Sequence, residues 1–209
     1  MLQNLLRFFY FGLLVRGFVL FFLGVNIRRR ELLPLRGPAI IVANHNSHLD
    51  TMVLMSLYPL HQLPHVRPVA AADYFLKNNV LSWFSQRIIG IIPMKRTAAR
   101  DVFAGVYEAL DKGDIVIFYP EGSRGEPERI AEMKKGIARI ADVYPNVPIT
   151  PVFIHGLGKV LPKDAWLPVP FFCDMFVGEA LRNDDGELLS RLKTRMEDLA
   201  HEKSFAPWE

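Results

Sequence analysis

The sequence predicts an α/β fold, a mostly parallel sheet flanked by helices, with an N-terminal helical segment that associates with a membrane. Three observations lead to this prediction. From residue 39 onward, short apolar runs that suit buried strands alternate with longer segments that suit helices. The first 30 residues are rich in leucine and phenylalanine. Of all 209 residues, 50% are apolar and 22% are charged, which is typical of a folded globule with one core. We therefore divide the chain into residues 1–30, the membrane-associating helices, and residues 31–209, the folded domain.

The apolar stretch at residues 5–27 reads LLRFFYFGLLVRGFVLFFLGVNI. A helix that spans a bilayer needs about 20 apolar residues in a row, and Arg16 interrupts this run near its middle, where a charge is costly. Arg7 lies nine residues before Arg16, which puts the two on opposite sides of an α-helix. We therefore predict two short helices, broken near Gly12 or Gly17, that dip into one leaflet. The alternative is a buried core helix. A removed signal peptide is disfavoured because no A-x-A cleavage site follows.

Within residues 31–209, strand-like and helix-like segments alternate along the chain. The predicted strands are 39–43, 67–71, 88–92, 114–120, 148–154 and 171–178. The predicted helices are 47–58, 74–87, 97–112, 128–143 and 184–202. This alternation favours a largely parallel sheet, in which sites gather where the strands end.

Charge and cysteine content exclude some classes of function. The net charge of +3 and the pI near 9.0 are too small an excess to indicate nucleic acid, but they suit an anionic membrane surface or an anionic substrate. The single cysteine, Cys173, excludes an intrachain disulfide and a Cys-x-x-Cys metal site. His61 and His65 flank a proline and lack a third ligand. We expect no metal site and no nucleic-acid partner.

Polar residues follow the first predicted strand, in the order Asn44, His45, Asn46, Ser47, His48, Leu49, Asp50. A strand-loop-helix turn can bring His45 and Asp50 together, and a histidine oriented by a carboxylate is a general base for a hydroxyl. Two alternatives stay open. Ser47 and Asp50 have the spacing of a capping box, in which Asp50 would only cap a helix. His48 is a rival base because it lies nearer to Asp50 in sequence.

The strand at 114–120 ends in the turn Pro-Glu-Gly-Ser-Arg. This turn places Glu121 and Arg124 at the same sheet edge as His45. Arg124 could hold a phosphate by two parallel hydrogen bonds. An ordinary loop is the alternative, because turns of this composition are common after strands.

Two other strands carry weaker signals. Lys95 and Arg96 follow the strand at 88–92, where they suit either a phosphate anchor or a solvated strand end. Pro148 and Pro151 lie in the strand at 148–154. Taken alone, these prolines indicate only the start or the edge of a strand.

Together these four blocks resemble the glycerolipid acyltransferase family, specifically the bacterial 1-acyl-glycerol-3-phosphate acyltransferases. That family shows, in order, Asn-His-x-x-x-x-Asp, Gly-x-x-x-x-x-Arg, Pro-Glu-Gly-Thr/Ser-Arg and Val-Pro-x-x-Pro. The matching blocks here are Asn44–Asp50, Gly90–Arg96, Tyr119–Arg124 and Val147–Pro151. Lys134 and Gly136 are similar to a Lys-x-Gly that follows the third block. The resemblance covers residues 35 to 181, and four blocks in order are far more specific than any one of them.

The resemblance implies an acyltransferase in which His45 is the general base and Asp50 is its partner. The residues implied to bind the acceptor phosphate or to shape its pocket are Arg96, Arg124, Glu121, Gly122 and Lys95. The other motif residues are Asn44, Ser123, Lys134, Pro148 and Pro151. No metal and no cofactor is implied, and the acyl donor would be acyl-CoA or acyl-carrier protein. Backbone N–H groups near residues 90–92 are candidates for stabilising the charge that develops on the thioester carbonyl.

The expected reaction moves a fatty acyl group to the free hydroxyl of a lysophospholipid, above all 1-acyl-glycerol-3-phosphate, giving phosphatidic acid. Met94 and Lys95 depart from the family's second block, which leaves a different lysolipid or glycerol 3-phosphate open as the acceptor. Tyr119 and Ser123 are milder departures, from Phe and Thr. A thioesterase-like hydrolase and a non-catalytic module that binds anionic lipid are further alternatives.

The expected partners are membrane lipid, the lysophospholipid acceptor and the acyl donor. The expected location is the cytoplasmic face of the bacterial inner membrane, with the protein either monotopic or held by a single N-terminal anchor. Three consecutive arginines, Arg28 to Arg30, follow the apolar stretch and suit the phosphates of that face.

Overall fold

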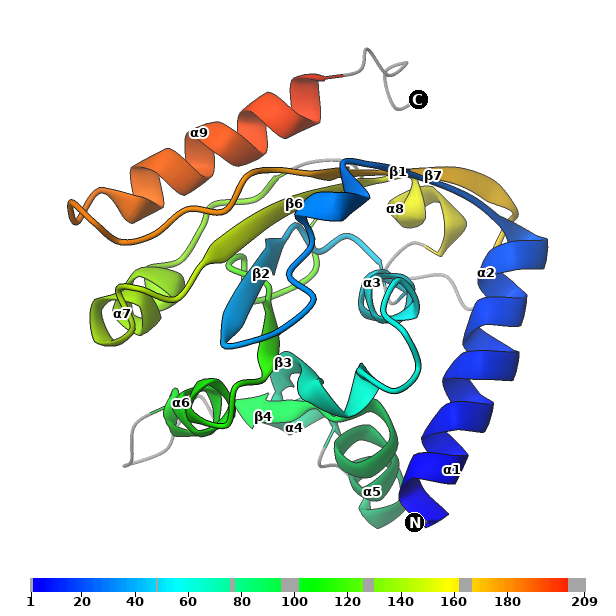
Figure 1. The fold of residues 1–209 in the computed structure, drawn as a ribbon. Helices are drawn as coiled ribbons and strands as arrows, with labels where there is room; N and C mark the ends of the chain where they lie inside the picture. Colours follow the sequence, from blue (N-terminus) through cyan, green and yellow to red (C-terminus); the bar gives the residue numbers. More distant parts are fainter. Residues whose placement is uncertain are drawn as a thin grey trace.

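The computed structural model describes residues 2–47, 49–75, 78–94, 102–125, 130–161 and 167–202. At its centre lies a seven-stranded sheet with the order β1-β7-β6-β2-β5-β3-β4 (Figure 1). The strands are β1 (Leu23–Arg28), β2 (Ala39–Ala43), β3 (Val66–Ala71), β4 (Ile92–Met94), β5 (Ile115–Phe118), β6 (Ile149–His155) and β7 (Phe171–Val177). Neighbouring strands are parallel except for β6 and β7, which are antiparallel. The predicted α/β fold with a mostly parallel sheet is confirmed.

Helices cover both faces of this sheet (Figure 1). One face carries α1 (Leu2–Phe9), α2 (Arg16–Phe22), α3 (Asp50–Ser56), α5 (Asn79–Phe84) and α8 (Leu157–Val160). The other face carries α6 (Ala104–Asp111), α7 (Gly136–Val143) and α9 (Leu188–His201). A four-residue helix, α4 (Ala72–Phe75), follows β3.

Strand β2 shows how the sheet builds a core on each face. Successive side chains of a strand point to opposite faces. Ile41 accordingly packs in the cluster beneath α1 to α3, while Ile40 and Val42 pack in the cluster beneath α6, α7 and α9. All five residues of β2 are buried, as expected for a parallel strand that is covered on both sides. Burial of each larger side chain, Ile40, Ile41 and Val42, stabilises the fold by roughly 1.5–3 kcal/mol, so β2 fixes the start of the loop that follows it.

The register brings the ends of β2 and β5 together beside the middle of β6. Val42 of β2 pairs with Phe118 of β5, and Ala43 of β2 pairs with Val152 of β6. These strands run in one direction together with β3 and β4, so the loops that follow all five leave at a single edge of the sheet. We call this the carboxyl edge, and the opposite one, where the same strands begin, the amino edge.

The N-terminal segment is one helix from Leu2 to Phe22, which corrects the predicted break near Gly12 or Gly17. A π-helical segment, Tyr10–Val15, joins α1 to α2 without interruption. By length and composition alone, this 21-residue helix could cross a membrane.

The π-helical segment also corrects the predicted placement of the two arginines. A π turn bonds residue i to residue i+5, so each residue turns less about the axis than in an α-helix. Arg7 and Arg16 therefore both face the folded domain. Arg7 Nε donates to the carbonyl oxygen of Ile88 at 2.7 Å, and Arg16 Nη2 donates to that of Tyr58 at 2.5 Å.

The residues after Phe22 form a strand, although the sequence predicts helix as far as residue 27. β1 pairs along its whole length with β7, from Leu23 opposite Phe171 to Arg28 opposite Phe176. The alternation of Leu23, Val25 and Ile27 with less apolar residues is a period-two signal that could have revealed this strand. The apolar run that precedes it hid that signal.

The predicted strand at 88–92 is also displaced. Ser85–Ile89 is π-helical, Gly90 has a φ of +89°, and β4 begins only at Ile92. The Ile-Ile-Gly-Ile-Ile run is buried in this conformation just as it would be in a strand. Periodicity cannot separate the two conformations for so short an apolar run.

The three arginines at the end of β1, Arg28 to Arg30, contact the rest of the protein. Arg29 Nε donates to the carbonyl oxygen of Val177 at 2.7 Å, and Arg30 Nη2 donates to that of Leu57 at 2.7 Å. The guanidinium of Arg28 lies over the ring of Phe176, 5.3 Å from its centroid. These contacts stabilise the fold.

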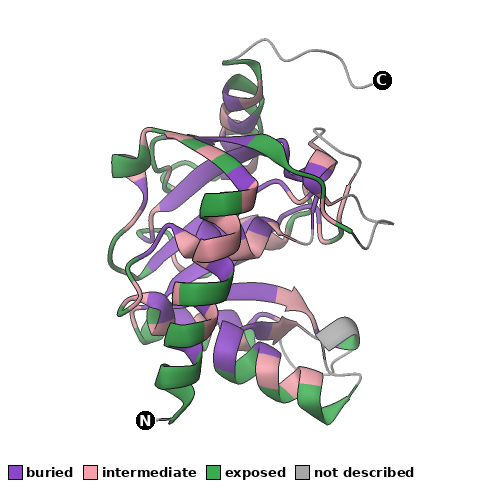
Figure 2. Cartoon of the chain, turned by 90° about the vertical axis from the view of Figure 1, so that its right-hand side faces the viewer, coloured by how far each residue is buried: buried purple, intermediate pink, exposed green. Residues whose placement is uncertain are grey.

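In Figure 2 the N-terminal helix faces the viewer with exposed residues along it, and many of these residues are large and apolar. The outward residues of the N-terminal helix are Leu2, Leu5, Leu6, Phe8, Phe9, Leu13, Leu14, Leu20 and Phe21. Its opposite side buries Phe11 and Val15 in the core. Val80 and Trp83 on α5 and Phe172 at the start of β7 are also exposed. Apolar surface of this extent marks an interaction site rather than ordinary solvent-facing surface.

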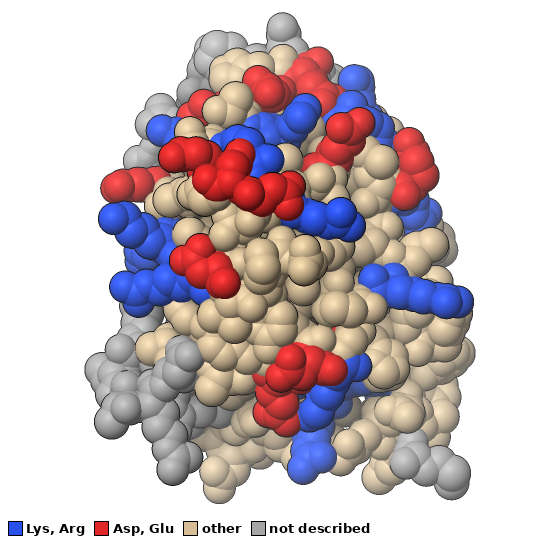
Figure 3. Space-filling model, turned by 60° about the vertical axis from the view of Figure 1, so that its left-hand side comes forward, with Lys and Arg blue, Asp and Glu red and all other residues tan. Residues whose placement is uncertain are grey.

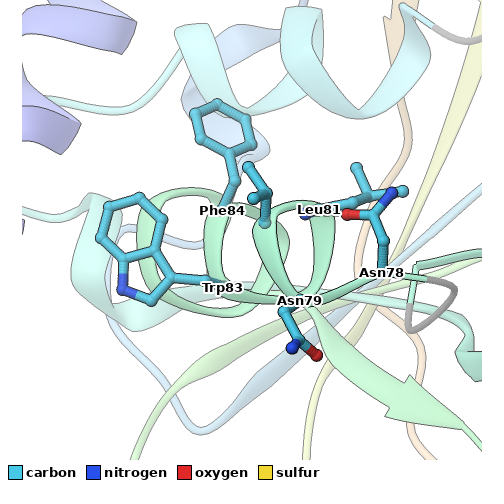
Figure 4. Close-up of a pocket in the computed structure, with 6 residues that line it drawn as sticks. Asn78, Asn79, Leu81, Trp83 and Phe84 are labelled. Atoms are coloured by element: carbon cyan, nitrogen blue, oxygen red, sulfur yellow. Dashed lines mark hydrogen bonds between the residues drawn. The ribbon is translucent and has the colours of Figure 1, made fainter.

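Helix α5 extends this side with a hollow of about 620 Å³ (Figure 4). Its lining residues are Asn78, Asn79, Val80, Leu81, Trp83 and Phe84. The ring of Phe84 packs edge-on against that of Tyr10, with centroids 5.0 Å apart. This contact attaches α5 to the N-terminal helix, so the two elements present their apolar residues together.

The face that carries α6, α7 and α9 has a different character. Figure 3 shows acidic and basic side chains interspersed over it. On α9, Arg191 pairs with Asp185 and Lys193 pairs with Glu197. Mixed charge of this kind is typical of a solvated face, and it lies across the sheet from the N-terminal helix (Figure 1).

Candidate active site

His45 and Asp50 meet in the loop that leaves β2 at the carboxyl edge. His45 Nδ1 lies 2.9 Å from Asp50 Oδ2. Because a carboxylate only accepts hydrogen bonds, Nδ1 is the donor in this contact, which leaves Nε2 as the nitrogen that can act as the base. Asp50 is 1% exposed, whereas the His45 side chain is 22% exposed and so stays accessible. This is the geometry of a general base with its orienting carboxylate.

Asp50 also orders the loop itself. The same Oδ2 atom accepts the backbone N–H groups of Asn46 and Ser47, both at 2.8 Å. The bond to Ser47 has the direction expected of one half of a capping box, but α3 begins at Asp50, with Leu49 as its N-cap and no side-chain cap. Asp50 therefore orients His45 and orders the loop before α3, rather than only capping a helix. His48, the rival base, lies outside the described residues.

Asn44 holds the start of this loop to the neighbouring strand. Its side chain accepts the backbone N–H of Ile154 at 2.7 Å and donates to the carbonyl oxygen of Ile154 at 2.8 Å. Asn44 is 1% exposed. Because the Asn44 amide forms both of these hydrogen bonds with one residue of β6, it holds the loop in place and is not a reacting group.

Tyr119 supports the ring of His45, which the sequence alone did not indicate. The two rings stack with centroids 4.2 Å apart and an interplanar angle of 23°. The Tyr119 hydroxyl lies 2.9 Å from Thr51 Oγ1 on α3. Burial raises the pKa of Tyr119, and the nearby Asp50 carboxylate raises it further, so the hydroxyl stays protonated. The stack depends on β2 and β5 being neighbours, which residue spacing does not reveal.

We expect the two contacts of Tyr119 to be separable by substitution. Tyr119→Phe keeps the stacked ring and loses the bond to Thr51, which should cost about 1 kcal/mol of stability and little activity. Tyr119→Leu loses the stack and should lower kcat about ten-fold with KM nearly unchanged. Steady-state kinetics on both variants tests this. Equal kcat values for the leucine and phenylalanine variants would show that the ring does not position His45.

The turn after β5 is fastened to the same loop. Gly125 N–H donates to the carbonyl oxygen of His45 at 2.9 Å, and Lys134 N–H donates to that of Pro120 at 2.9 Å. Gly122 has a φ of +72°, and a Cβ there would lie 2.9 Å from Lys134 Nζ. Glycine is therefore required at this position, and the Lys134 ammonium group lies against the turn.

Glu121 is buried behind this turn, and its carboxyl group holds a proton more tightly than an exposed glutamate does. Burial raises its pKa to about 7; Asp50 also raises it, while hydrogen bonds from the backbone of Ala131 and His45 lower it. Glu121 Oε2 has no hydrogen-bond partner among the described residues. Near pH 7 such a carboxyl group is protonated about half of the time, so it repels an anion bound beside it less than an ordinary glutamate does.

The raised pKa of Glu121 predicts a specific pH dependence of stability. The folded protein holds this proton more tightly than the unfolded chain does. The contribution of Glu121 to the free energy of unfolding therefore decreases by about 3 kcal/mol as the pH rises from about 4.5 to about 7. Above that range the contribution levels off. Glu121→Gln should remove this part of the profile, as measured by urea unfolding below and above that range. Parallel profiles for the two proteins would contradict the assignment.

The remaining predicted residues are distributed unevenly around the site. Arg124 is half-buried and Ser123 is exposed, both in the turn that Gly125 fastens to His45. Lys95 and Arg96 lie outside the described residues.

The two prolines of β6 do not reach the site. Pro148 precedes β6 at the amino edge, where its carbonyl oxygen accepts the N–H of Ile40 at 2.9 Å. Pro151 lies within β6 opposite Val42 and accepts the N–H of Gly178 at 2.9 Å. Both prolines therefore belong to the sheet.

The N–H groups suggested for the thioester oxyanion are occupied elsewhere. Those of Gly90 and Ile91 both donate to the carbonyl oxygen of Ser85 at 2.9 Å. Gly90 also precedes β4, at the amino edge, whereas His45 follows β2 at the carboxyl edge. That expectation is therefore wrong. These bonds form where Gly90 adopts a left-handed conformation, which the apolar sequence around it did not predict.

The fold and the site together define an α/β protein with a histidine–carboxylate base at the carboxyl edge of its sheet. The profile of the acyltransferase family matches residues 24–155. This match covers more than half of the chain, which therefore belongs to the acyltransferase family. The family resemblance predicted from the four sequence blocks is confirmed.

Named relatives agree with this assignment. The chain is 32% identical over 145 residues to the chloroplast 1-acyl-sn-glycerol-3-phosphate acyltransferase LPAT1 of Arabidopsis thaliana, covering 68% of this chain and 38% of that protein. It is 31% identical over 143 residues to human 1-acyl-sn-glycerol-3-phosphate acyltransferase beta, covering 68% and 50%. The chain thus matches 38% and 50% of the length of these two curated relatives.

The fold is similar to a solved structure. The crystal structure of the 1-acyl-sn-glycerophosphate (LPA) acyltransferase PlsC from Thermotoga maritima superposes with a TM-score of 0.72. The match covers 100% of this chain and 97% of that one, at 22% sequence identity. At this identity the likeness concerns the fold.

Proposed function

We propose that this protein transfers a fatty acyl group from acyl-CoA or acyl-carrier protein to the free hydroxyl of a lysophospholipid. The proposed acceptor is 1-acyl-glycerol-3-phosphate, and the product is phosphatidic acid. The observation that carries the proposal is the His45–Asp50 contact at 2.9 Å, which lies beside the turn that carries Arg124. The names of the relatives support the acceptor.

The proposed reaction uses the accessible nitrogen of His45. Nε2 takes the proton of the acceptor hydroxyl as its oxygen attacks the thioester carbonyl carbon. The imidazolium that forms is stabilised by the carboxylate of Asp50. When the carbon–sulfur bond breaks, the proton on Nε2 passes to the departing thiolate, which leaves as a thiol. No cofactor takes part in this scheme.

Cations beside the turn suit the phosphate of the acceptor. Arg124 and the Lys134 ammonium group both lie at the Pro-Glu-Gly turn. With a pKa of about 7, Glu121 is protonated about half of the time near pH 7 and opposes a bound anion less than an ordinary glutamate would. Lys95 and Arg96 stay predicted members of this anchor.

An acceptor panel tests the phosphate-anchor role. Arg124→Ala should lower kcat/KM for lysophosphatidic acid by about 10- to 100-fold, because a charge-assisted hydrogen bond contributes about 1.5–3 kcal/mol. Hydrolysis of the donor thioester in the absence of acceptor should change little. Arg139→Ala on the solvated face is the matched control. An equal loss of transfer and hydrolysis would rule out phosphate binding by Arg124, and transfer only to glycerol 3-phosphate or another lysolipid would reassign the acceptor.

We also propose that the N-terminal helix lies in the membrane surface at the cytoplasmic face of the bacterial inner membrane. Its outward side is apolar, while Phe11, Val15 and both arginines are held against the domain. A perpendicular span would have to break these contacts, which favours a monotopic arrangement over a single spanning anchor. The apolar side would then enter one leaflet and leave the mixed-charge face in water.

A substitution on the outward side should weaken membrane binding. Phe21 is 93% exposed, so Phe21→Glu should leave folding intact and reduce partition into lipid vesicles about ten-fold or more. Val143→Glu on α7, across the sheet, is the matched control because Val143 is also exposed. Vesicle flotation measures both. Equal effects of the two changes would exclude the helix as the membrane contact.

A further inference from the structure

A second pocket lies at the amino edge of the sheet, away from His45. Its volume is about 410 Å³, and its polar lining residues include Gln3, Arg7, Arg67, Arg87, Glu108 and Lys112. It is formed around the starts of β3 and β4 and by α1 and α6, whereas the candidate active site follows the ends of β2 and β5. This pocket has no role in the proposed acyl transfer.

Two guanidinium groups converge inside this pocket. Arg67 Nε donates to the carbonyl oxygen of Gly90 at 2.6 Å, and Arg7 reaches the same point from α1. A Cβ placed on Gly90 would lie 3.4 Å from Arg67 Nε and 3.5 Å from Arg7 Nη2. The left-handed glycine thus leaves a small space bordered by both cations.

The positive charge here is only partly compensated. Lys112 pairs with Glu108 at 2.5 Å, and Arg67 lies 3.6 Å from Asp114, which also bonds His65. Arg7 is 9% exposed and donates to the carbonyl oxygens of Ile88 and Arg87. Within the described part of the chain, Arg7 and Arg87 form no ion pair with a carboxylate.

An anion would complete this arrangement. A buried charge without a counter-charge is costly, and arginine forks match the oxygens of phosphate. The mouth of the pocket adjoins the first turns of α1, where Leu2, Leu5 and Leu6 are exposed. We propose that this pocket binds a phosphate group between Arg7 and Arg67, carried either by the head group of an anionic phospholipid or by free phosphate.

The first arm of the test measures thermal stability in inorganic phosphate against chloride at matched ionic strength. A ligand that binds the folded state raises Tm. Arg67→Gln removes one side of the site, and Arg87→Gln removes an exposed lining cation with little risk to folding. Arg67→Gln should lose the part of the phosphate-dependent rise that is due to this pocket, and Arg87→Gln should lose some of that part. Arg139→Gln should keep all of it, and Arg124→Ala should keep the part due to this pocket, because Arg124 lies at the other edge.

The second arm identifies the source of the phosphate. Binding to phosphatidylcholine vesicles is compared with and without phosphatidylglycerol. Loss of about five-fold in affinity for the anionic vesicles in Arg67→Gln and Arg87→Gln, but not in Arg139→Gln, assigns the site to a lipid head group. A loss confined to the first arm assigns it to free phosphate.

Wild-type behaviour of both variants in both arms would overturn the proposal. Acyl transfer in detergent should be unchanged in Arg87→Gln. Failure of the phosphate-site proposal would therefore leave the proposed catalytic function intact.

Discussion

Replacement of His45 by alanine should lower the rate of acyl transfer by about 10²- to 10⁴-fold, the range that a general base contributes. His45 keeps part of its side chain exposed while its Nδ1 is held by the carboxylate of Asp50. Without it, the acceptor hydroxyl would have to lose its proton to water. Binding of the lipid should survive, because the cations at the neighbouring turn are unchanged.

The measurement is initial-rate transfer of a labelled acyl group, with folding checked by thermal unfolding. His61→Ala is the matched control, because His61 is exposed in a loop outside the site. A folded His45→Ala variant with undiminished transfer would eliminate His45 as the base. Retained lipid binding with no transfer would separate the enzyme from a module that only binds lipid.

Substitution of Asp50 should reduce both activity and stability. In Asp50→Asn the amide no longer stabilises the imidazolium, and we expect kcat to fall about 10²-fold or more. In Asp50→Ala the backbone N–H groups of Asn46 and Ser47 also lose their acceptor, which should cost about 1–3 kcal/mol of stability for each buried donor.

The matched control is a helix cap far from the site. Asn78 accepts the N–H of Leu81 at 2.7 Å at the start of α5, and Asn78→Ala should cost about 1 kcal/mol without changing kcat. Kinetics and urea unfolding on the three variants decide between the roles of Asp50. If Asp50→Asn behaves like Asn78→Ala, Asp50 serves only to order the loop.

Local spacing explains why part of the site could be predicted. His45 and Asp50 are five residues apart, so a single loop brings them together whatever the rest of the chain does. The buried strands β2 and β5 are short apolar runs with clear ends, which placed both blocks at one edge. The resemblance to the acyltransferase family then implied the roles of the residues in these blocks.

Long-range geometry explains what could not be predicted. The pairing of β1 with β7 joins residues about 150 positions apart, and no local pattern reports it. The stack of Tyr119 on His45 depends on which strands are neighbours. The π-helical segment changes the rotation between Arg7 and Arg16, so a helical count based on α geometry put them on opposite sides.

The most direct test of the central claim follows the fate of the acyl carbon. Purified protein in detergent is given labelled palmitoyl-CoA or palmitoyl-carrier protein together with lysophosphatidic acid, and the products are separated. The proposed function predicts label in phosphatidic acid, abolished in His45→Ala and dependent on the acceptor. Label released only as free fatty acid would contradict it and identify a thioesterase-like hydrolase.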